Sequence, residues 1–278
     1  MRRAEGSPPY LKLQMIFILF LILTYILANR CRKGHPGMAA LRGHSYAHRG
    51  LHRPGVPENS MAAFRAALEK GYGIEFDLHL LKDGELAVIH DSSLKRTAGV
   101  DVHIEDLTVA DLKNYPLEGT EETVPTLRQL LDLYAGKAPL IVELKPEGGN
   151  HAALCEKAAQ MLESYSGPYC IESFDPRCVR WFRKNRPDVI RGQLAENFVR
   201  SDSKMPLWLR LVLTHQLMNF GCVPDFTAYK FSDRKGASPF VCRRLWKAQG
   251  VTWTLKTREE YDAAVKEGWL PIFEGFEP

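Results

Sequence analysis

The chain lacks the cysteine patterns that mark zinc sites, redox motifs and disulfide frameworks. Among 278 residues its six cysteines form no C-x-x-C pair and no Cys/His zinc spacing. Their number is even but their positions are scattered, so we favour free thiols over a set of disulfides. They are Cys31, Cys155, Cys170, Cys178, Cys222 and Cys242. The cysteines therefore do not identify the redox compartment.

The chain also lacks a strong imbalance of charge. Lys and Arg number 37 against 33 Asp and Glu, which gives a formal net charge of +4, and the basic residues do not gather in a stripe. This argues against a nucleic-acid partner. No internal repeat or low-complexity segment interrupts the sequence, and its hydrophobic content of 45% is that of an ordinary globular chain.

One long apolar run is present, at the N-terminus. Residues 13–28 contain only three polar side chains, and with Tyr10 and Leu11 the run approaches the ~20 residues that cross a bilayer. We expect residues 1–30 to form a single-pass membrane anchor and residues 31–43 a linker. The side of the membrane is not predicted, because basic residues flank the run on both sides. They are Arg2, Arg3 and Lys12, then Arg30, Arg32 and Lys33.

A cleaved signal peptide is the alternative for this run, because a charged segment precedes a long apolar one. Asn29 and Arg30 occupy the place where a small-x-small cleavage site would be needed. We therefore favour the uncleaved anchor.

From residue 44 onward, short apolar runs alternate with helical patterns, which indicates βαβ units and a parallel sheet. Strands are expected at 44–48, 74–80, 140–145, 169–174, 189–194, 226–231, 251–255 and 270–274. Helices are expected at 59–70, 109–115, 126–134, 151–164, 176–185, 239–249 and 258–267. Eight parallel strands at this spacing predict an α/β fold, a TIM (β/α)8 barrel, over residues 44–278.

The tight turn Lys82-Asp83-Gly84 follows the second strand. A connection this short cannot be a parallel crossover, so residues 86–90 should return antiparallel, as a hairpin insertion. This return brings His90 to about the level of Asp77.

Three carboxylates occur inside apolar strands. Glu75 and Asp77 share one face of the second strand, and Glu143 and Lys145 share one face of the third. All four are expected near the C-terminal ends of adjacent strands, where barrel enzymes keep their chemistry. Converging carboxylates need positive charge between them, and oxygen ligands favour Mg2+ or Ca2+ over zinc.

Two histidines flank this cluster. His48 ends the first strand and His90 ends the hairpin arm, which suggests a general acid and a general base. For either histidine alone, an ordinary hydrogen-bonded role is equally plausible. Arg49 suits bidentate phosphate binding and favours phosphoryl chemistry. His52 and His79 are expected to be structural or solvent-facing.

At these residues the sequence resembles the glycerophosphodiester phosphodiesterase family, whose barrel is related to that of phosphatidylinositol-specific phospholipases C. The resemblance covers about residues 44–275. Its pieces are His48-Arg49-Gly50, Pro57-Glu58-Asn59-Ser60, Glu75-Phe76-Asp77, Lys82-Asp83-Gly84, His90-Asp91, Arg96-Thr97, Pro125-Thr126-Leu127, Glu143-Leu144-Lys145, Ser173-Phe174 and Trp253-Thr254.

The resemblance implies a role for each matching residue. The metal ligands would be Glu75, Asp77 and Glu143, the acid/base pair His48 and His90, the phosphate-binding residues Arg49 and Lys145, and the substrate-mouth residue Trp253. Glu58 would orient Arg49, and Asn59 is expected to cap the helix that follows.

Two departures from the family pattern lie near the C-terminus. Leu255-Lys256 stand in place of Val-Asn, and the terminal Thr-Asp is replaced by Phe273-Glu274-Gly275-Phe276. We expect both departures to alter only the rim of the site, without reaching the metal or histidine positions.

The implied reaction is metal-dependent hydrolysis of glycerophosphodiesters, such as glycerophosphocholine or glycerophosphoethanolamine, to glycerol 3-phosphate and an alcohol. We assign His48 as base and His90 as acid, and the nucleophile is either the glycerol 2-hydroxyl or water. Cleavage of lysophospholipids at the membrane, as by a lysophospholipase D, is the alternative. Two rivals are a non-catalytic phosphate- or lipid-binding membrane protein and a barrel glycosidase.

Residues 205–220 are unusually apolar for a connection, with Arg210 as their only charged residue. They form either a helix packed on the barrel or an interfacial helix on the membrane. The sequence does not predict the oligomeric state.

Overall fold

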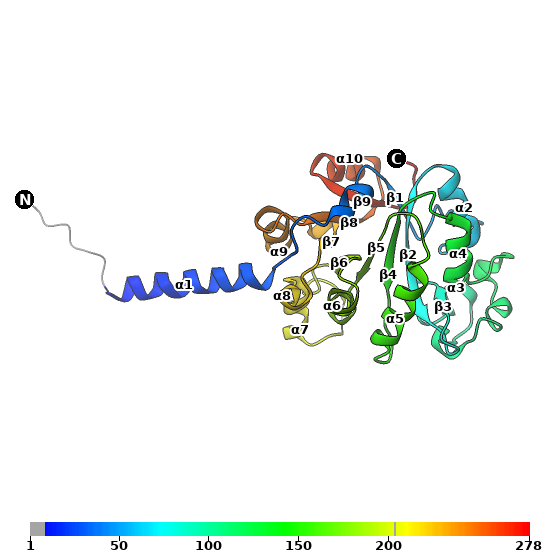
Figure 1. Cartoon of the computed structure of the whole chain (residues 1–278), viewed down its shortest axis with the longest axis horizontal. Coiled ribbons are helices and arrows are strands. Elements are labelled where there is room, and N and C mark those ends of the chain that lie inside the picture. The colour runs from blue at the N-terminus through cyan, green and yellow to red at the C-terminus, as the bar shows by residue number, and fades with distance from the viewer. Residues whose placement is uncertain (1–8, 203) are drawn as a thin grey trace, which may run out of the picture.

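The computed structural model describes residues 9–202 and 204–278, and its centre is a closed β-barrel (Figure 1). Eight parallel strands follow the order β1-β9-β8-β7-β6-β5-β4-β2, and the pairing of β1 with β2 closes the ring. The strands are β1 (Tyr46–His48), β2 (Gly73–Leu80), β4 (Leu140–Leu144), β5 (Tyr169–Ser173), β6 (Ile190–Ala195), β7 (Phe226–Lys230), β8 (Gln249–Leu255) and β9 (Trp269–Phe273). The predicted (β/α)8 barrel is confirmed.

Helices surround this barrel. The longer ones begin and end close to the predicted positions, whereas the helix expected at 239–249 is divided and ends at Leu245, before β8 begins. They are α2 (Met61–Glu69), α4 (Leu127–Tyr134), α5 (His151–Leu162), α6 (Pro176–Asn185), α7 (Leu207–Thr214), α8 (Asn219–Cys222), α9 (Ala237–Phe240), η6 (Val241–Leu245) and α10 (Arg258–Lys266). Shorter turns are η1 (Pro36–Leu41), α3 (Lys95–Ala98), η2 (Ile104–Asp106), η3 (Leu112–Asn114), η4 (Leu117–Gly119) and η5 (Phe231–Asp233).

Strand alternation decides which side chains enter the barrel. On β2, the side chains of Ile74, Phe76 and Leu78 are fully buried in the core cluster that the strands share with the surrounding helices. Because successive side chains alternate, Glu75 and Asp77 point to the opposite side, into the barrel. The same alternation on β4 and β5 places Ile141 and Cys170 in the separate apolar cluster of the barrel interior.

The helix after β1 begins one residue later than predicted. Ser60 has extended backbone and its hydroxyl oxygen accepts the Ala63 N–H at 3.1 Å, so Ser60 caps α2. The prediction that Asn59 is the cap is wrong. Asn59 takes a left-handed backbone, with φ of 51°, and its buried side chain turns toward Asp77 instead.

The hairpin insertion is present. The short strand β3 (Leu86–Val88) runs antiparallel to β2, with Leu78 opposite Val88. The Ile89 N–H then donates to the Asp77 carbonyl at 3.1 Å, which brings the next residue, His90, to the level of Asp77. Residues between Leu81 and Val124 bury a small apolar core of their own under this hairpin.

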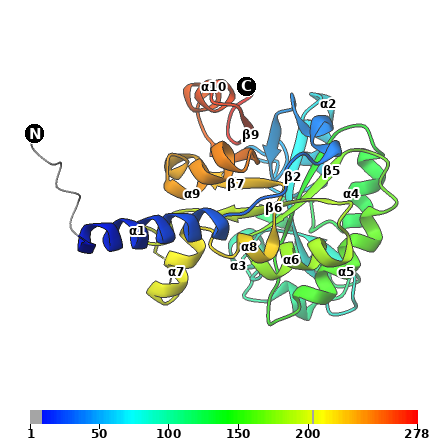
Figure 2. The same cartoon turned by 60° about the vertical axis from the view of Figure 1, so that its left-hand side comes forward.

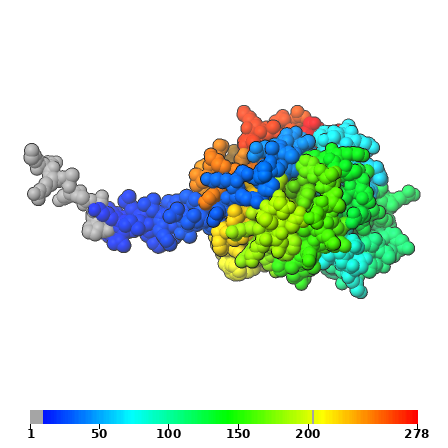
Figure 3. Space-filling model, in the orientation of Figure 1, coloured from blue at the N-terminus to red at the C-terminus, as the bar shows by residue number. Residues whose placement is uncertain are grey.

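The helix α1 (Pro9–Ala28) extends away from the barrel (Figures 1 and 3). Its segment Tyr10–Ala28 is long and apolar enough to cross a membrane, a property that signal sequences share. Arg2 and Arg3, predicted to flank the anchor, lie outside the described residues.

The segment 31–43, expected to be a linker, packs along the barrel. Met38 and Leu41 are buried in the cluster that fills the barrel interior, and Arg32 Nη2 donates to Asp225 Oδ2 at 2.7 Å. These contacts join α1 to the barrel through folded chain. Cys31 in this segment and the other five cysteines are buried and free, as their scattered positions indicated.

Gly50 allows the turn after β1 to lie directly against α2. Its φ is 80°, and a Cβ there would lie 2.9 Å from the Ala63 Cβ, whereas Gly84 has a φ of 82° and open space around it. Gly84→Ala should therefore lower the free energy of unfolding by about 1 kcal/mol through strain alone. Gly50→Ala should lower it by about 2–4 kcal/mol, because overpacking adds to strain.

Chemical denaturation of both variants and of the unsubstituted chain in the same detergent would measure these losses. Equal losses in the two variants would contradict the close contact inferred between Gly50 and α2.

Candidate active site

Acidic side chains meet inside the C-terminal end of the barrel. Strand register aligns Asp77 with Glu143, and Glu143 with Glu172, on three adjacent strands. Glu75 lies one step below on β2, aligned with His48 of β1. One carboxylate oxygen from each of Glu75, Asp77 and Glu143 lies within 4.8 Å of the others, and all three residues are buried.

Asp77 is the carboxylate best supplied with donors. Lys145 Nζ lies 3.1 Å from its Oδ1, while the Asn59 amide donates to its Oδ2 at 2.9 Å and Arg49 Nε lies 3.6 Å from the same oxygen. Burial by itself raises the pKa of Asp77, but the positive charges of Lys145, His90 and Arg49 outweigh it. The pKa of Asp77 therefore lies well below its usual range, and the group is ionised.

Glu75 and Glu143 are short of positive charge by comparison. Glu75 receives one long hydrogen bond, at 3.4 Å from the Arg49 N–H, and burial together with Asp77 and Glu143 raises its pKa well above the usual value. Burial raises the pKa of Glu143 to about 7, even though Lys145 Nζ lies 2.8 Å away. Converging, charge-deficient carboxylate oxygens are the donor set that a hard divalent cation prefers, so these residues could hold one.

Glu172 is a fourth acid of the cluster, and the sequence analysis missed it. Its side chain is buried, its Oε2 has no hydrogen-bond partner among the described residues, and burial together with Glu143 raises its pKa. The signal that identified Glu143, an acid inside an apolar strand, is also present in Tyr-Cys-Ile-Glu-Ser of β5. The same argument would therefore have found Glu172.

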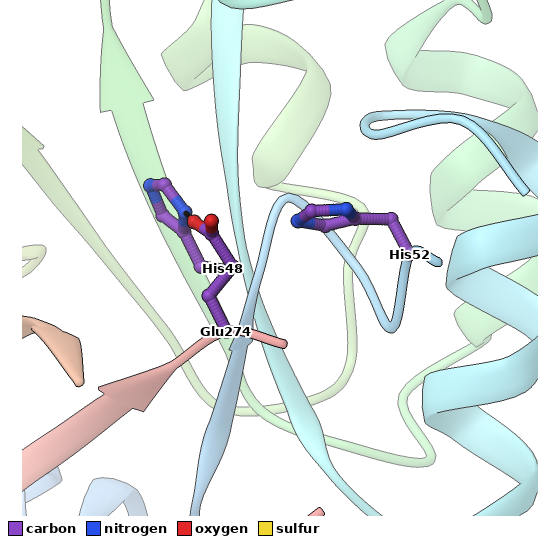
Figure 4. Close-up of side chains that lie close together, drawn as sticks. All are labelled: His48, His52 and Glu274. Carbon is purple, nitrogen blue, oxygen red and sulfur yellow. Dashed lines mark hydrogen bonds and ion pairs between the residues drawn. The ribbon is translucent and has the colours of Figure 1, made fainter. Parts of the chain in front are cut away.

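His48 has a carboxylate partner at the C-terminal end of the chain. Its Nδ1 lies 2.5 Å from Glu274 Oε2, while its Nε2 lies 3.8 Å from Glu75 Oε2. The bond to His48 lowers the pKa of Glu274 to about 2, and burial lowers the pKa of His48 despite this partner. Figure 4 shows Glu274 reaching His48 from the end of β9 while His52 points toward the same carboxylate.

This contact corrects one expectation. The replacement of the family's terminal Thr-Asp was predicted to leave the histidine positions untouched, but Glu274 contacts His48 directly. Because β9 pairs with β1, residues separated by more than 200 positions in the sequence become neighbours at the barrel seam. A motif comparison that treats each piece separately cannot detect such a contact.

His90 is held by a chain of ion pairs. Its Nδ1 lies 2.6 Å from Asp91 Oδ1, and Arg96 bridges the other oxygen of Asp91 to Glu58. Glu58 also accepts from Arg49 Nη1 at 2.8 Å, as expected of a residue that orients Arg49. Glu58 therefore links Arg49 to His90, through Arg96 and Asp91.

His79 supports the same hairpin from below. It is buried, with Nδ1 at 2.6 Å from Glu105 and Nε2 at 3.2 Å from the His90 carbonyl. Its position is structural, as the sequence suggested.

An aromatic wall borders this charged cluster. Trp253 of β8 packs edge-to-face on Phe174 with ring centroids 5.6 Å apart, and Phe174 packs similarly on Phe198 at 5.9 Å. A narrow pocket of about 90 Å³ lies between the wall and the acids. Its lining includes His48, Arg49, Glu75, His90, Glu143, Glu172, Phe174 and Trp253.

The structure brings all nine predicted residues into one site. Six of them line the pocket. Of the other three, Lys145 contacts Glu143 and Asp77, Asp77 lies beside Arg49, and Glu58 contacts Arg49. The arrangement combines two histidines, each bonded to a carboxylate, with two cations and a buried oxygen-ligand cluster. Such a set can bind an anionic centre, exchange protons with it and hold a divalent cation beside it.

Comparisons with known proteins agree with this geometry. The family model "Glycerophosphoryl diester phosphodiesterase family" matches residues 42–219. A glycerophosphodiester phosphodiesterase of Caldanaerobacter subterraneus is 28% identical over 80% of this chain and 89% of its own length. The lysophospholipase D GDPD1 of Rattus norvegicus is 31% identical, over 41% of this chain and only 40% of its own length.

Solved structures share the fold. A phosphodiesterase of Oleispira antarctica, in complex with the product sn-glycerol-3-phosphate, superposes with a TM-score of 0.67 at 20% identity, covering 83% of this chain and 92% of its own. A putative glycerophosphoryl diester phosphodiesterase of Silicibacter pomeroyi gives 0.67 at 22% identity, covering 87% and 94%.

The family model covers well over half of the chain, and the solved structures share its barrel fold. The chain therefore belongs to the glycerophosphoryl diester phosphodiesterase family and is a phosphoric diester hydrolase.

Proposed function

We propose that the chain hydrolyses glycerophosphodiesters, such as glycerophosphocholine or glycerophosphoethanolamine, to glycerol 3-phosphate and a free alcohol. The observation that carries this proposal is the convergence of three buried carboxylates, two cations and two histidines on one pocket. The mature chain would act as a single-pass membrane protein anchored by α1.

The ligands we propose for a divalent cation, Mg2+ or Ca2+, are Glu75, Asp77 and Glu143. Their oxygens lie close enough to share one ion, and the raised pKa values of Glu75 and Glu143 reflect the positive charge that they lack. A cation bound there would polarise the phosphodiester and offset its negative charge.

The protein's own residues divide the remaining work. Arg49 presents a guanidinium fixed by Glu58 and binds the phosphodiester oxygens. Lys145 stabilises the negative charge that develops on those oxygens. We assign His48, aligned by Glu274, as the base that activates the nucleophile, and His90, aligned by Asp91, as the acid that protonates the departing alcohol.

A lysophospholipase D-type activity is the second candidate. Two observations favour it: the aromatic wall of Phe174, Phe198 and Trp253, and the exposed apolar side chains on the nearby helix α7. Parallel assays with glycerophosphocholine and lysophosphatidylcholine would separate the two activities.

Removal of divalent cations should abolish release of glycerol 3-phosphate. We expect EDTA to eliminate turnover of glycerophosphocholine and either Mg2+ or Ca2+ to restore it, while the circular dichroism spectrum stays unchanged. Full activity in EDTA would contradict the proposed cation. Absence of activity under every condition would favour a non-catalytic binding protein.

Replacing a proposed acid/base or ligand residue should stop the reaction without unfolding the chain. His48→Ala and Glu75→Ala should each lower kcat for glycerophosphocholine by at least about 100-fold, the usual contribution of a positioned proton-transfer group. The exposed His103→Ala serves as a matched control and should retain activity. Retained turnover in both site variants would refute the assignment.

Glu274 should influence the rate through His48 rather than through substrate binding. Glu274→Gln removes the charge that aligns and supports the imidazole, so we expect kcat to fall about 10- to 100-fold with little change in KM. Glu274→Asp keeps the carboxylate and should lose less. If kcat is unchanged in Glu274→Gln, the contact has no role in positioning His48.

A further inference from the structure

The C-terminal end of α1 is fixed to the barrel. The Tyr25 hydroxyl lies 2.9 Å from His215 Nδ1, just after α7, and Trp246 Nε1, just after η6, donates to the Ile26 carbonyl at 2.8 Å. Asn29, which follows the helix, is completely buried. α1 therefore leaves the barrel from a docked last turn, without a flexible connection.

The apolar segment of α1 is only just long enough to cross a membrane, so no helical turn remains to hold the barrel away from it. The apolar segment Tyr10–Ala28 has 19 residues, which at 1.5 Å per residue span about 28 Å, close to the roughly 30 Å of a hydrocarbon core. If α1 crosses the bilayer, its docked last turn lies at the level of the lipid headgroups. The barrel surface that holds this turn must then lie there as well.

We call this surface the α1-base face and define it by the exposed apolar side chains of α7, α8, α9, η6 and Met218. In both cartoon views α7 and α9 lie on opposite sides of the end of α1 (Figures 1 and 2). Its members are Leu207, Trp208, Leu211, Met218, Phe220, Phe240 and Leu245, of which Trp208 is 65% exposed. Outside α1 and this face, the exposed large apolar side chains of the described residues are all valines.

The segments that form and flank the face are basic, although Arg32 among them is paired with Asp225. Residues 26–36, 204–224 and 237–250 contain no Asp or Glu, although the chain has 33 of them, and they contain eight Lys and Arg. Lys33 Nζ lies 5.9 Å from the ring of Trp246, the residue that bonds α1. Basic and aromatic side chains around an apolar patch match the interfacial layer of a membrane that contains anionic lipids.

We propose that the α1-base face lies in the headgroup layer of an anionic lipid bilayer, so that α1 and the barrel meet the membrane as one rigid unit. This inference rests on the proposed anchor and is independent of the proposed reaction. Tyr25 and Trp246 then occupy the depth at which amphipathic rings gather in membrane proteins. The aromatic and leucine side chains of α7 to η6 insert among the acyl chains, and the basic residues contact lipid phosphates.

The buried native thiols make a direct test possible. Single cysteines introduced as Trp208→Cys and Phe240→Cys, on the face, and as Val109→Cys and Val265→Cys, on exposed apolar positions elsewhere, can carry bimane. The full chain is reconstituted into phosphatidylcholine–phosphatidylglycerol vesicles with and without nitroxide-labelled lipid. We expect quenching of at least about twofold at positions 208 and 240, and none at 109 and 265.

Carbonate extraction of the same samples reports whether α1 is inserted. If α1 is inserted but the labels at positions 208 and 240 are not quenched, the proposed contact of the α1-base face is wrong and the anchor stands. If carbonate releases the chain, both the membrane contact of the α1-base face and the anchor are wrong. Glycerol 3-phosphate release by the unlabelled chain is assayed separately, so its absence would count only against the proposed reaction.

Discussion

The burial of like charges inside the barrel is the constraint on which the rest of this site depends. Four carboxylates, Glu75, Asp77, Glu143 and Glu172, point into a space from which water is largely excluded. Charge buried at this density is costly unless it is neutralised. Lys145 and Arg49 neutralise Asp77, but the raised pKa values of the other acids indicate that the protein's own cations are insufficient.

The same constraint explains why the surrounding residues form linked ion pairs. Each histidine is fixed through Nδ1 by a carboxylate, His48 by Glu274 and His90 by Asp91, which leaves each Nε2 for chemistry. These supporting acids come from distant parts of the chain, since Asp91 follows the hairpin after β2 and Glu274 follows β9. Barrel closure therefore does more than bury apolar surface, since it also brings Glu274 to His48.

Local sequence patterns were enough to predict most of the fold and most residues of the candidate site. Strand positions followed from short apolar runs, the hairpin followed from the three-residue turn, and Glu143 was recognised as an acid in an apolar strand. Glu172 was equally accessible to that argument but was overlooked.

The features that could not be predicted depend on contacts between distant segments. Glu274 reaches His48 because β9 lies beside β1, and residues 31–43 pack on the barrel because Met38 and Leu41 join the apolar cluster of its interior. Asn59 was misassigned because the same side chain can cap a helix or donate a hydrogen bond to a buried carboxylate. The positive φ of Asn59 and its bond to Asp77 show the second role.

On this reasoning, we propose that the buried acids form a binding site for one divalent cation. Calorimetric titration of the detergent-solubilised chain with Mg2+ or Ca2+ would measure this binding, with Glu75→Gln as the comparison. We expect one bound ion per chain in the unsubstituted protein and a loss of binding in the variant. Equal binding by both proteins, or no binding by either, would contradict it.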